Sequence, residues 1–304
     1  MRLLAVLALA LALPAAALEP IRVSPSVYYI QGDSGIPSQA NRGHTSNAGF
    51  VVTNDGVVVF DALGTPVLGA ELAAAIRKTT PLPFRRVIVS HYHADHIYGL
   101  QPLKAGGAEV WAHRAARAYL QSEGAQARLA ERRKTLAPWV GADTRLVPGD
   151  RWLEGEEAFK LGGLTFRIIP LGPAHTPEDL AMMVEEEGVL FVGDVMFTGR
   201  LPFVGDADTR AWIAAIDRVV KANPKIVIGG HGAASRSAAA DLALTRDYLA
   251  YLRKTMGTAA NELEDFEVAY RRTDWSRFAT LPAFEAVNRR NAYNTYIRMQ
   301  GGEK

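Results

Sequence analysis

The sequence HYHADH, from His91 to His96, concentrates potential metal ligands in one short segment. It follows three apolar residues and a serine, which is typical of a loop at the end of a buried strand. Since extended backbone places residues two apart on one side, His91 and His93 can face one metal ion. Asp95 and His96 follow where the chain turns, and they can face a second ion. Imidazole nitrogens and carboxylate oxygens are the ligands that suit zinc in a hydrolytic site.

Three further candidate ligands follow separate apolar segments, each beside glycine or proline: His175, Asp194 and His231. His175 would complete a set of three histidines for the first ion. His231 would complete the set of Asp95 and His96 for the second ion. Asp194 could bridge the two ions, because a carboxylate can donate one oxygen to each. Any of these residues taken alone is typical of an ordinary loop or turn, so the prediction depends on the combination.

A pair of metal ions would give this segment hydrolytic chemistry. Two ions about 3.5–4 Å apart can share a hydroxide and stabilise the charge that develops on a substrate oxygen. Zinc lowers the pKa of its bound water to about 7, so the nucleophile is available at neutral pH. We predict that Asp95 is catalytic as well as metal-binding, because it can also orient the hydroxide. Asp61, at the end of an earlier apolar run, is either a hydrogen-bond partner of a ligand histidine or an ordinary turn residue.

The elements that must position these residues are strands closed by helices. Apolar runs at 49–53 and 57–61, joined by Asn-Asp-Gly, predict a hairpin, and the pattern at 66–80 predicts a helix. A long charged helix is expected at 114–136 and a strand at 145–147. Strand-rich blocks of this kind occur in both halves of the chain. They predict an α/β fold in which two sheets pack face to face with helices outside.

Two long irregular segments, Gln31–Asn47 and Phe197–Asp206, are candidates for the borders of a substrate cleft. Arg200 could pair with a substrate carboxylate or could be a solvated loop arginine. Tyr92 and Phe203 are candidates for apolar contact with the substrate. The fold alone does not determine which substrate is bound.

Composition excludes several functions. The 304 residues have a formal net charge of +2, which gives no electrostatic basis for binding nucleic acid or an anionic membrane. There is no cysteine, so disulfides, thiol catalysis and zinc–thiolate sites are excluded. A small-molecule substrate is therefore the expected partner, and the oligomeric state is left open.

The first 17 residues have the pattern of a signal peptide: a basic start, an apolar Leu/Ala/Val run and small residues at its end. An ordinary N-terminal helix is the alternative. The signal peptide predicts export, to a bacterial periplasm, with no membrane attachment once the leader is removed. We expect the main fold over residues 18–236 and a helical C-terminal part of the same domain over 237–304.

In their order and spacing, these residues resemble the metallo-β-lactamase-fold superfamily of metallohydrolases. The segment from His91 to His96 matches its signature motif, and Asp61 matches the aspartate of an early strand-end motif. His175, Asp194 and His231 fall at the positions of its later ligands. The resemblance implies a four-layer αβ/βα sandwich with the metals at one edge of the sheets, here with a helical C-terminal extension.

Within the superfamily, the chain is similar to exported zinc hydrolases associated with sulfur-oxidation and quinoprotein systems. Asp194 stands where the best-known lactamases have cysteine, and this bridging aspartate is shared with glyoxalase-II-like thioesterases and lactonases. The resemblance therefore implies two Zn²⁺ and hydrolysis of a thioester, ester or lactone. Alternatives are β-lactam hydrolysis, a mononuclear iron sulfur dioxygenase with one Fe, and a non-catalytic accessory protein of a redox system.

Overall fold

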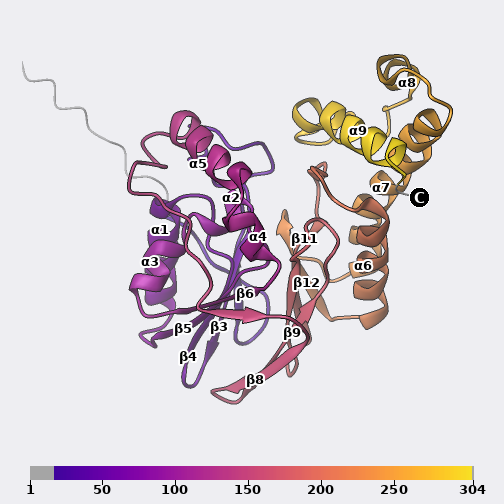
Figure 1. Cartoon of the computed structure of the whole chain (residues 1–304). Coiled ribbons are helices and arrows are strands. Elements are labelled where there is room, and N and C mark those ends of the chain that lie inside the picture. Colours follow the sequence, from indigo (N-terminus) through magenta and orange to yellow (C-terminus); the bar gives the residue numbers. More distant parts are fainter. Residues whose placement is uncertain (1–16, 303–304) are drawn as a thin grey trace, which may run out of the picture.

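Two β-sheets lie face to face at the centre of the computed structural model, which describes residues 17–302 (Figure 1). Within that range, the first sheet has the strand order β1 (Ile21–Arg22), β2 (Val27–Ile30), β3 (Ala48–Thr53), β4 (Gly56–Phe60), β5 (Phe84–Ile88), β6 (Glu109–His113) and β7 (Arg151–Leu153). The second has the order β12 (Ile226–His231), β11 (Val189–Phe197), β10 (Leu180–Val184), β9 (Leu164–Pro170) and β8 (Glu157–Leu161). The predicted leader falls on residues 1–17, almost wholly outside the described part, and stays a prediction.

Alternating residues of both sheets form the core between them. Val58 and Phe60 of β4 point into this layer, and Met182 of β10 and Phe191 of β11 meet them from the second sheet. The rings of Phe60 and Phe191 stack with their centroids 5.2 Å apart. This alternation is what the pleat of a strand imposes, so the other face of each sheet is left for helices.

Helices cover both outer faces and complete four layers. The helices α1 (Pro66–Thr79), α2 (Ala94–Ile97) and α3 (Leu100–Ala105) pack on the first sheet, with α4 (Ala116–Leu120) and α5 (Glu123–Thr135) beside them. The second sheet is covered by α6 (Thr209–Ala222) and α7 (Ala238–Asn261), which α8 (Phe266–Arg272) and α9 (Phe284–Gln300) follow. The expected α/β sandwich is confirmed, including its C-terminal helices.

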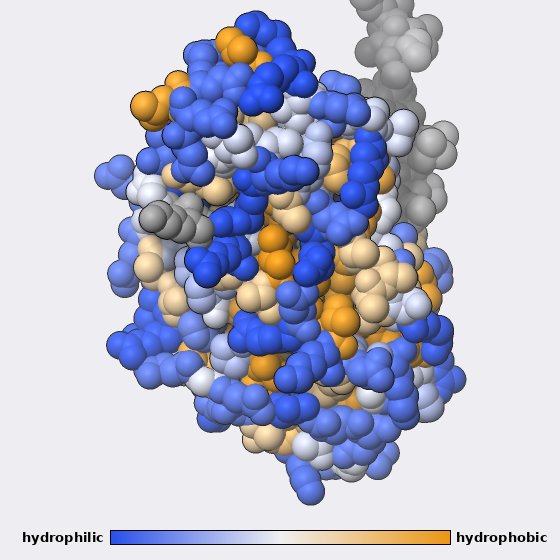
Figure 2. Space-filling view, turned by 90° about the vertical axis from the view of Figure 1, so that its right-hand side faces the viewer, coloured by the Kyte–Doolittle hydropathy of each residue, from blue (hydrophilic) through white to orange (hydrophobic). Residues whose placement is uncertain are grey.

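The C-terminal helices share one apolar core with the second sheet. Leu249 of α7 and Ala292 of α9 belong to the same buried cluster as Met196 of β11 and Trp212 of α6. The face of the molecule on the side of these helices is mostly hydrophilic, with small hydrophobic areas between polar residues (Figure 2). No helix within residues 17–302 is both long enough and apolar enough to cross a membrane.

Two predicted elements differ from the structure. The long helix expected at 114–136 is divided at Ser122, whose hydroxyl accepts from the backbone N–H of Ala125 and caps α5. The strand expected at 145–147 does not form. The backbone N–H of Arg145 donates to the side chain of Gln101 on α3, so this segment is held away from β6, and the chain joins the sheet only at β7.

Candidate metal centre

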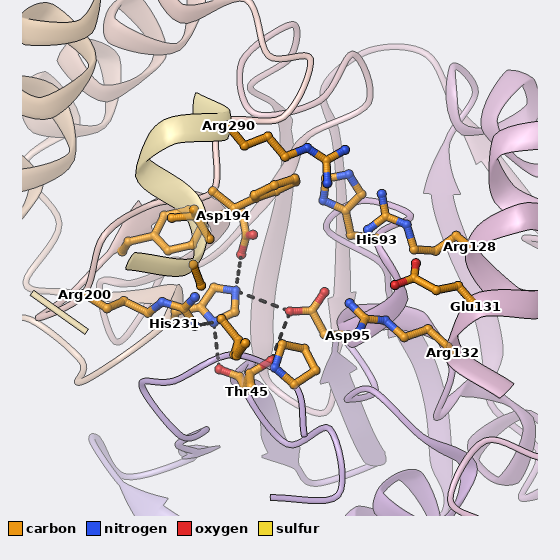
Figure 3. A pocket seen from close by; sticks show the side chains of 16 residues that line it. Thr45, His93, Asp95, Arg128, Glu131, Arg132, Asp194, Arg200, His231 and Arg290 are labelled. Atoms are coloured by element: carbon orange, nitrogen blue, oxygen red, sulfur yellow. Dashed lines mark hydrogen bonds and ion pairs between the residues drawn. The ribbon is translucent and has the colours of Figure 1, made fainter. Parts of the chain in front are cut away.

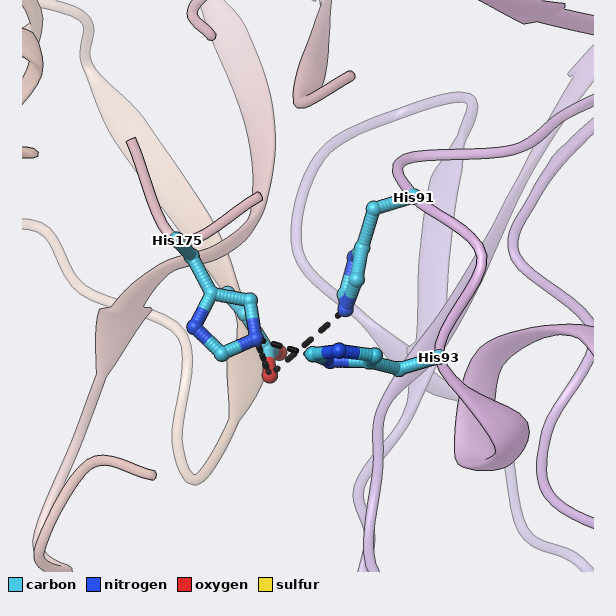
Figure 4. A group of neighbouring side chains, drawn as sticks. His91, His93 and His175 are labelled. Carbon is cyan, nitrogen blue, oxygen red and sulfur yellow. Dashed lines mark hydrogen bonds and ion pairs between the residues drawn. The ribbon is translucent and has the colours of Figure 1, made fainter. Parts of the chain in front are cut away.

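The predicted ligands come together where the carboxyl ends of β5, β11 and β12 meet. His91 and His93 lie in the loop after β5, and His93 directly precedes α2. His175 lies in the loop between β9 and β10, while Asp194 is part of β11. The rings of His91, His93 and His175 turn toward one another from these separate elements (Figure 4).

These three histidines and Asp194 form a first group of possible ligands, with one atom from each within 4.8 Å of the others. The Nε2 atom of His175 lies 2.9 Å from Nδ1 of His93 and 3.3 Å from Oδ2 of Asp194. The Nε2 atom of His91 lies 3.9 Å from the same carboxylate oxygen. Four lone-pair donors therefore converge on one point.

Asp95, His96 and His231 form the second group. The Oδ2 atom of Asp95 lies 3.5 Å from Nε2 of His231 and 3.9 Å from Nε2 of His96. The other carboxylate oxygen of Asp194, Oδ1, is 3.1 Å from His96 and 3.3 Å from His231 at the same nitrogens. Asp194 thus presents one oxygen to each group, which is the arrangement expected of a bridging carboxylate.

Gly230 makes room for this bridge. A Cβ atom at position 230 would collide with Oδ1 of Asp194, so a side chain there would displace the carboxylate. On β11, Gly193 has a φ of 52°, and the pairing of β11 with β12 shifts at this residue. The shift lets Asp194 face the site from within a strand whose residues are all buried.

Unpaired buried atoms show that the two groups fit metal ions. Within the described residues, Nε2 of His91, Nε2 of His96 and Oδ1 of Asp194 are buried without a hydrogen-bond partner. Burying polar atoms in this way costs free energy unless something binds them. All three point into the two groups, so a divalent cation in each would satisfy them, and the all-nitrogen-and-oxygen donor set suits zinc.

In three of the ligand histidines, a hydrogen bond at Nδ1, on the side of the ring away from the site, fixes which ring nitrogen faces the site. The Nδ1 atom of His96 lies 2.8 Å from Asp61, and Nδ1 of His91 lies 2.9 Å from the hydroxyl of Ser90. The Nδ1 atom of His231 lies 2.7 Å from the carbonyl oxygen of Thr45. Each of these partners leaves Nε2 turned toward the groups described above.

Burial favours neutral imidazoles at His93 and His175, and neighbouring histidines favour an ionised carboxylate at Asp95. Burial is the main cause that lowers the pKa of His93 to about 3 and that of His175 to about 4. Burial alone would raise the pKa of Asp95, but His96 and His231 outweigh it and hold that pKa at about 2. These three side chains therefore favour the protonation states that metal binding requires.

His96 differs from the other histidines. Burial alone would lower its pKa, but the carboxylates of Asp194 and Asp61 raise that pKa well above its ordinary value. The two carboxylates therefore favour the protonated form of His96 more than that of His91, His93 or His175, and a metal ion at Nε2 has to compete with a proton.

A cavity of about 420 Å³ opens onto both groups (Figure 3). Residues of both predicted loops line it, including Ile36, Thr45, Arg200 and Phe203. The guanidinium of Arg200 is largely buried and donates to the carbonyl of Gly35 at 3.0 Å. Arg200 and Phe203 therefore line the cavity that opens onto the candidate ligands, and their contact with a substrate stays a prediction.

Tyr92 does not lie in this cavity, which corrects its prediction as a substrate contact. Its side chain is fully buried, and its hydroxyl donates to the carbonyl of Val147 at 3.1 Å. Its ring stacks with Trp152. The alternation that turns His91 and His93 toward the metal site turns the intervening residue into the core.

Sequence reasoning missed the arginines of the cavity. Arg128 and Arg132 of α5 and Arg290 of α9 line it together with the predicted loops. In the sequence these arginines are typical of the charged, exposed face of a helix. Nothing in the local sequence indicates that the two helices border the same cavity.

The family model of the Metallo-beta-lactamase superfamily matches residues 41–231, which include all seven candidate ligands. The chain belongs to this superfamily. It is 31% identical over 158 residues to the hydroxyacylglutathione hydrolase GloC of Haemophilus influenzae, a match that covers 50% of this chain and 70% of that protein. It is 28% identical over 192 residues to the metallo-beta-lactamase type 2 of Bacillus cereus, with 62% and 67% of the two chains covered.

The fold is also similar to that of the sec-alkylsulfatase Pisa1 from Pseudomonas sp. The TM-score is 0.72 at 20% identity, and the match covers 94% of this chain and 50% of that chain. The superfamily member described here is a metallohydrolase by family and has a candidate site for metal ions.

Proposed function

We propose that this metallohydrolase holds two zinc ions and hydrolyses a carbonyl compound: a thioester, an ester or a lactone. The observation that supports this most directly is Asp194, which presents one oxygen to each of two complete ligand groups. The buried, unpartnered atoms of His91 and His96 support an ion in each group.

When bound, the two ions would polarise the substrate carbonyl and make water available as a nucleophile near neutral pH. The protein's own residues fix the geometry. Asp194 holds the two ligand groups together, and Asp95 is ionised and partly exposed at the cavity, so its carboxylate can accept a hydrogen bond from water and orient it. Arg200 places a cation beside His231, where negative charge on a substrate would be stabilised.

Thioester, ester or lactone cleavage is favoured by likeness to a hydroxyacylglutathione hydrolase. Likeness to a Bacillus cereus metallo-beta-lactamase supports β-lactam hydrolysis as the second candidate. A mononuclear iron dioxygenase would use one ligand group only, and the second group, Asp95, His96 and His231, would bind no metal ion. A dinuclear hydrolase uses both groups and so accounts for more of the site. Export, and an association with sulfur-oxidation or quinoprotein systems, remain part of this proposal and rest on the sequence alone.

The test is elemental analysis of the protein purified without chelator, followed by thioester, lactone and β-lactam substrates. We expect about two zinc ions per chain and turnover of a thioester, ester or lactone. Turnover of β-lactams alone would replace the leading substrate class with the second candidate. About one iron ion per chain, with oxygen consumption, would overturn the dinuclear hydrolase.

A further inference from the structure

A second hollow adjoins the cavity over the metal centre. We call the 420 Å³ cavity the metal-facing cavity and the adjoining hollow of about 630 Å³ the side chamber. The residues that line both are His93, Arg128, Phe203 and Arg290. A molecule that extends from the metal-facing cavity into the side chamber therefore passes beside these four side chains.

Two of the four are arginines from opposite sides of the opening. Arg128 lies on α5, which packs with the first sheet, and Arg290 lies on α9, which packs with the second. Figure 3 shows their guanidinium groups converging beside His93. The guanidinium of Arg290 also lies 5.5 Å from the centroid of the Phe203 ring.

Neither guanidinium has an acidic partner among residues 17–302. The structure gives Arg128 and Arg290 no hydrogen bond or ion pair with another described residue, whereas the adjacent Arg289 pairs with Glu267. Two cations that face one another across a cavity repel, and an oxyanion between them would remove that repulsion. Guanidinium groups bind carboxylate, sulfate and phosphate oxygens in a bidentate way.

The remaining charges of the metal-facing cavity also favour an anion. Arg132 and Arg200 line it, and Glu131 is the one acid on its wall, within the described chain, that belongs to neither ligand group. Asp95 and Asp194 face the histidine nitrogens, so bound metal ions would neutralise them.

The side chamber suits an apolar group. Much of its lining is apolar or aromatic: Ala115, Ala118, Tyr119, Pro177 and Phe203. Two acids also border it. Glu178 is buried and accepts from the backbone N–H of Tyr92, and Asp206 is exposed at the rim.

We propose that the substrate is an anionic carbonyl compound with an apolar portion, whose oxyanion is bound between Arg128 and Arg290. The apolar portion occupies the side chamber, and the scissile carbonyl lies in the metal-facing cavity. The C-terminal helices thus contribute a specificity-determining residue. Turnover of such a substrate rests on the proposed hydrolase function, but its binding does not.

Binding is tested on metal-free protein by calorimetry, because a carboxylate could otherwise bind the metal ions directly. Octanoate is the anionic probe, and octanamide is the neutral probe of the same length. We expect octanoate to bind more tightly, and Arg128→Gln or Arg290→Gln to weaken its binding roughly tenfold while octanamide is unaffected. Arg289→Gln is the matched control, because it removes the neighbouring arginine that pairs elsewhere, and it should leave both affinities unchanged. Equal binding of the two probes, no binding of octanoate, or unchanged affinity in both variants would overturn the proposal.

Turnover gives a second measurement on zinc-loaded protein. The substrates are two thioesters that differ only in a carboxylate. Either glutamine variant should raise KM for the charged thioester with kcat nearly unchanged, and should change neither KM nor kcat for the neutral thioester. An equal effect on both thioesters would contradict the anion site. Absence of turnover for every substrate would overturn the hydrolase function, and the binding result with octanoate would still decide the anion site.

Discussion

Asp61 lies directly behind His96, with its Oδ2 atom 2.8 Å from Nδ1 of that imidazole. The same carboxylate accepts from the backbone N–H and the hydroxyl of Ser90, both at 2.7 Å. Asp61 adopts a φ of 61°, which is uncommon for a residue other than glycine, and three hydrogen bonds compensate for this conformation. Of the two sequence-based interpretations of Asp61, this geometry favours the partner of a ligand histidine.

Replacing Asp61 should therefore weaken metal binding at the second group. In Asp61→Asn, an amide can no longer accept from His96 and both donors of Ser90 at once, so the orientation of the imidazole is lost. We expect zinc affinity at one of the two sites to fall by about 10–100-fold, the range typical of such partners. A competition titration with a chromophoric chelator measures this. Two sites of unchanged affinity would show that Asp61 acts only as a turn residue.

The two ligand groups should lose their ions independently. His93→Ala removes a donor from the first group, and His231→Ala removes one from the second, so each variant should bind about one zinc ion in place of two. We expect hydrolysis to fall on the order of a hundredfold or more, because each ion supplies several kcal/mol of transition-state stabilisation. Circular dichroism should be unchanged.

His113→Ala is the matched control for these variants. His113 is a half-buried histidine of β6 that belongs to neither ligand group. Its replacement should leave metal content and turnover at the wild-type level. Full turnover by His93→Ala or His231→Ala with wild-type metal content would contradict the assignment of the site.

Local spacing was sufficient to predict most of the candidate site. His91 and His93 alternate on extended backbone, and glycine or proline beside His175 and His231 indicates sharp turns. The prediction of Tyr92 as a substrate contact was wrong because the alternation that turns His91 and His93 to one side turns Tyr92 to the other. The sequence does not indicate which of these sides faces the core.

The anion site depends on tertiary structure and could not be predicted in this way. Arg128 and Arg290 are separated by more than half of the chain and meet only because α5 and α9 cover the same end of the two sheets. The sequence shows each of them as one charged residue on a helix. The division of the predicted helix at Ser122 had a local signal, a serine followed by glutamate, but the charged pattern on both sides concealed it.

Asn47 should be important for stability as well as for the position of His231. Its side-chain amide donates to the carbonyls of Gly229 and Gly232, at 2.9 and 2.8 Å, and accepts from the backbone N–H of Gly32 at 3.0 Å. Asn47→Ala would leave these buried groups unpaired, so we expect the free energy of unfolding to fall by roughly 3 kcal/mol.

Urea denaturation of metal-free protein measures this loss, since bound zinc would add its own stabilisation. Asn54→Ala is the control, because Asn54 is exposed at the tip of the hairpin between β3 and β4, where a substitution should change stability by less than about 0.5 kcal/mol. An equal loss in the free energy of unfolding for the two substitutions would show that the hydrogen bonds of Asn47 do not stabilise the fold.

The buried carboxyl of Asp179 should make stability depend on pH. Burial raises its pKa to about 8, even though the backbone N–H and hydroxyl of Thr176 both donate to it. In the unfolded chain the pKa of an aspartate is about 4. Between these values the folded protein holds a proton that the unfolded chain has lost, so the contribution of Asp179 to stability declines as pH rises from about 4 to about 8.

Comparison with Asp179→Asn isolates this contribution, because all other titrating groups are common to both proteins. The free energy of unfolding of metal-free wild type, minus that of the variant, should decrease by on the order of a few kcal/mol between pH 4 and pH 8 and become level above it. The amide of the variant does not titrate, and its hydrogen bonds to Thr176 are the same at every pH. Any constant loss of stability caused by the substitution therefore does not affect how the difference in unfolding free energy changes with pH. A difference that is independent of pH over this range would mean that Asp179 is ionised in the folded protein and that the loop bearing His175 contains a buried carboxylate rather than a carboxylic acid.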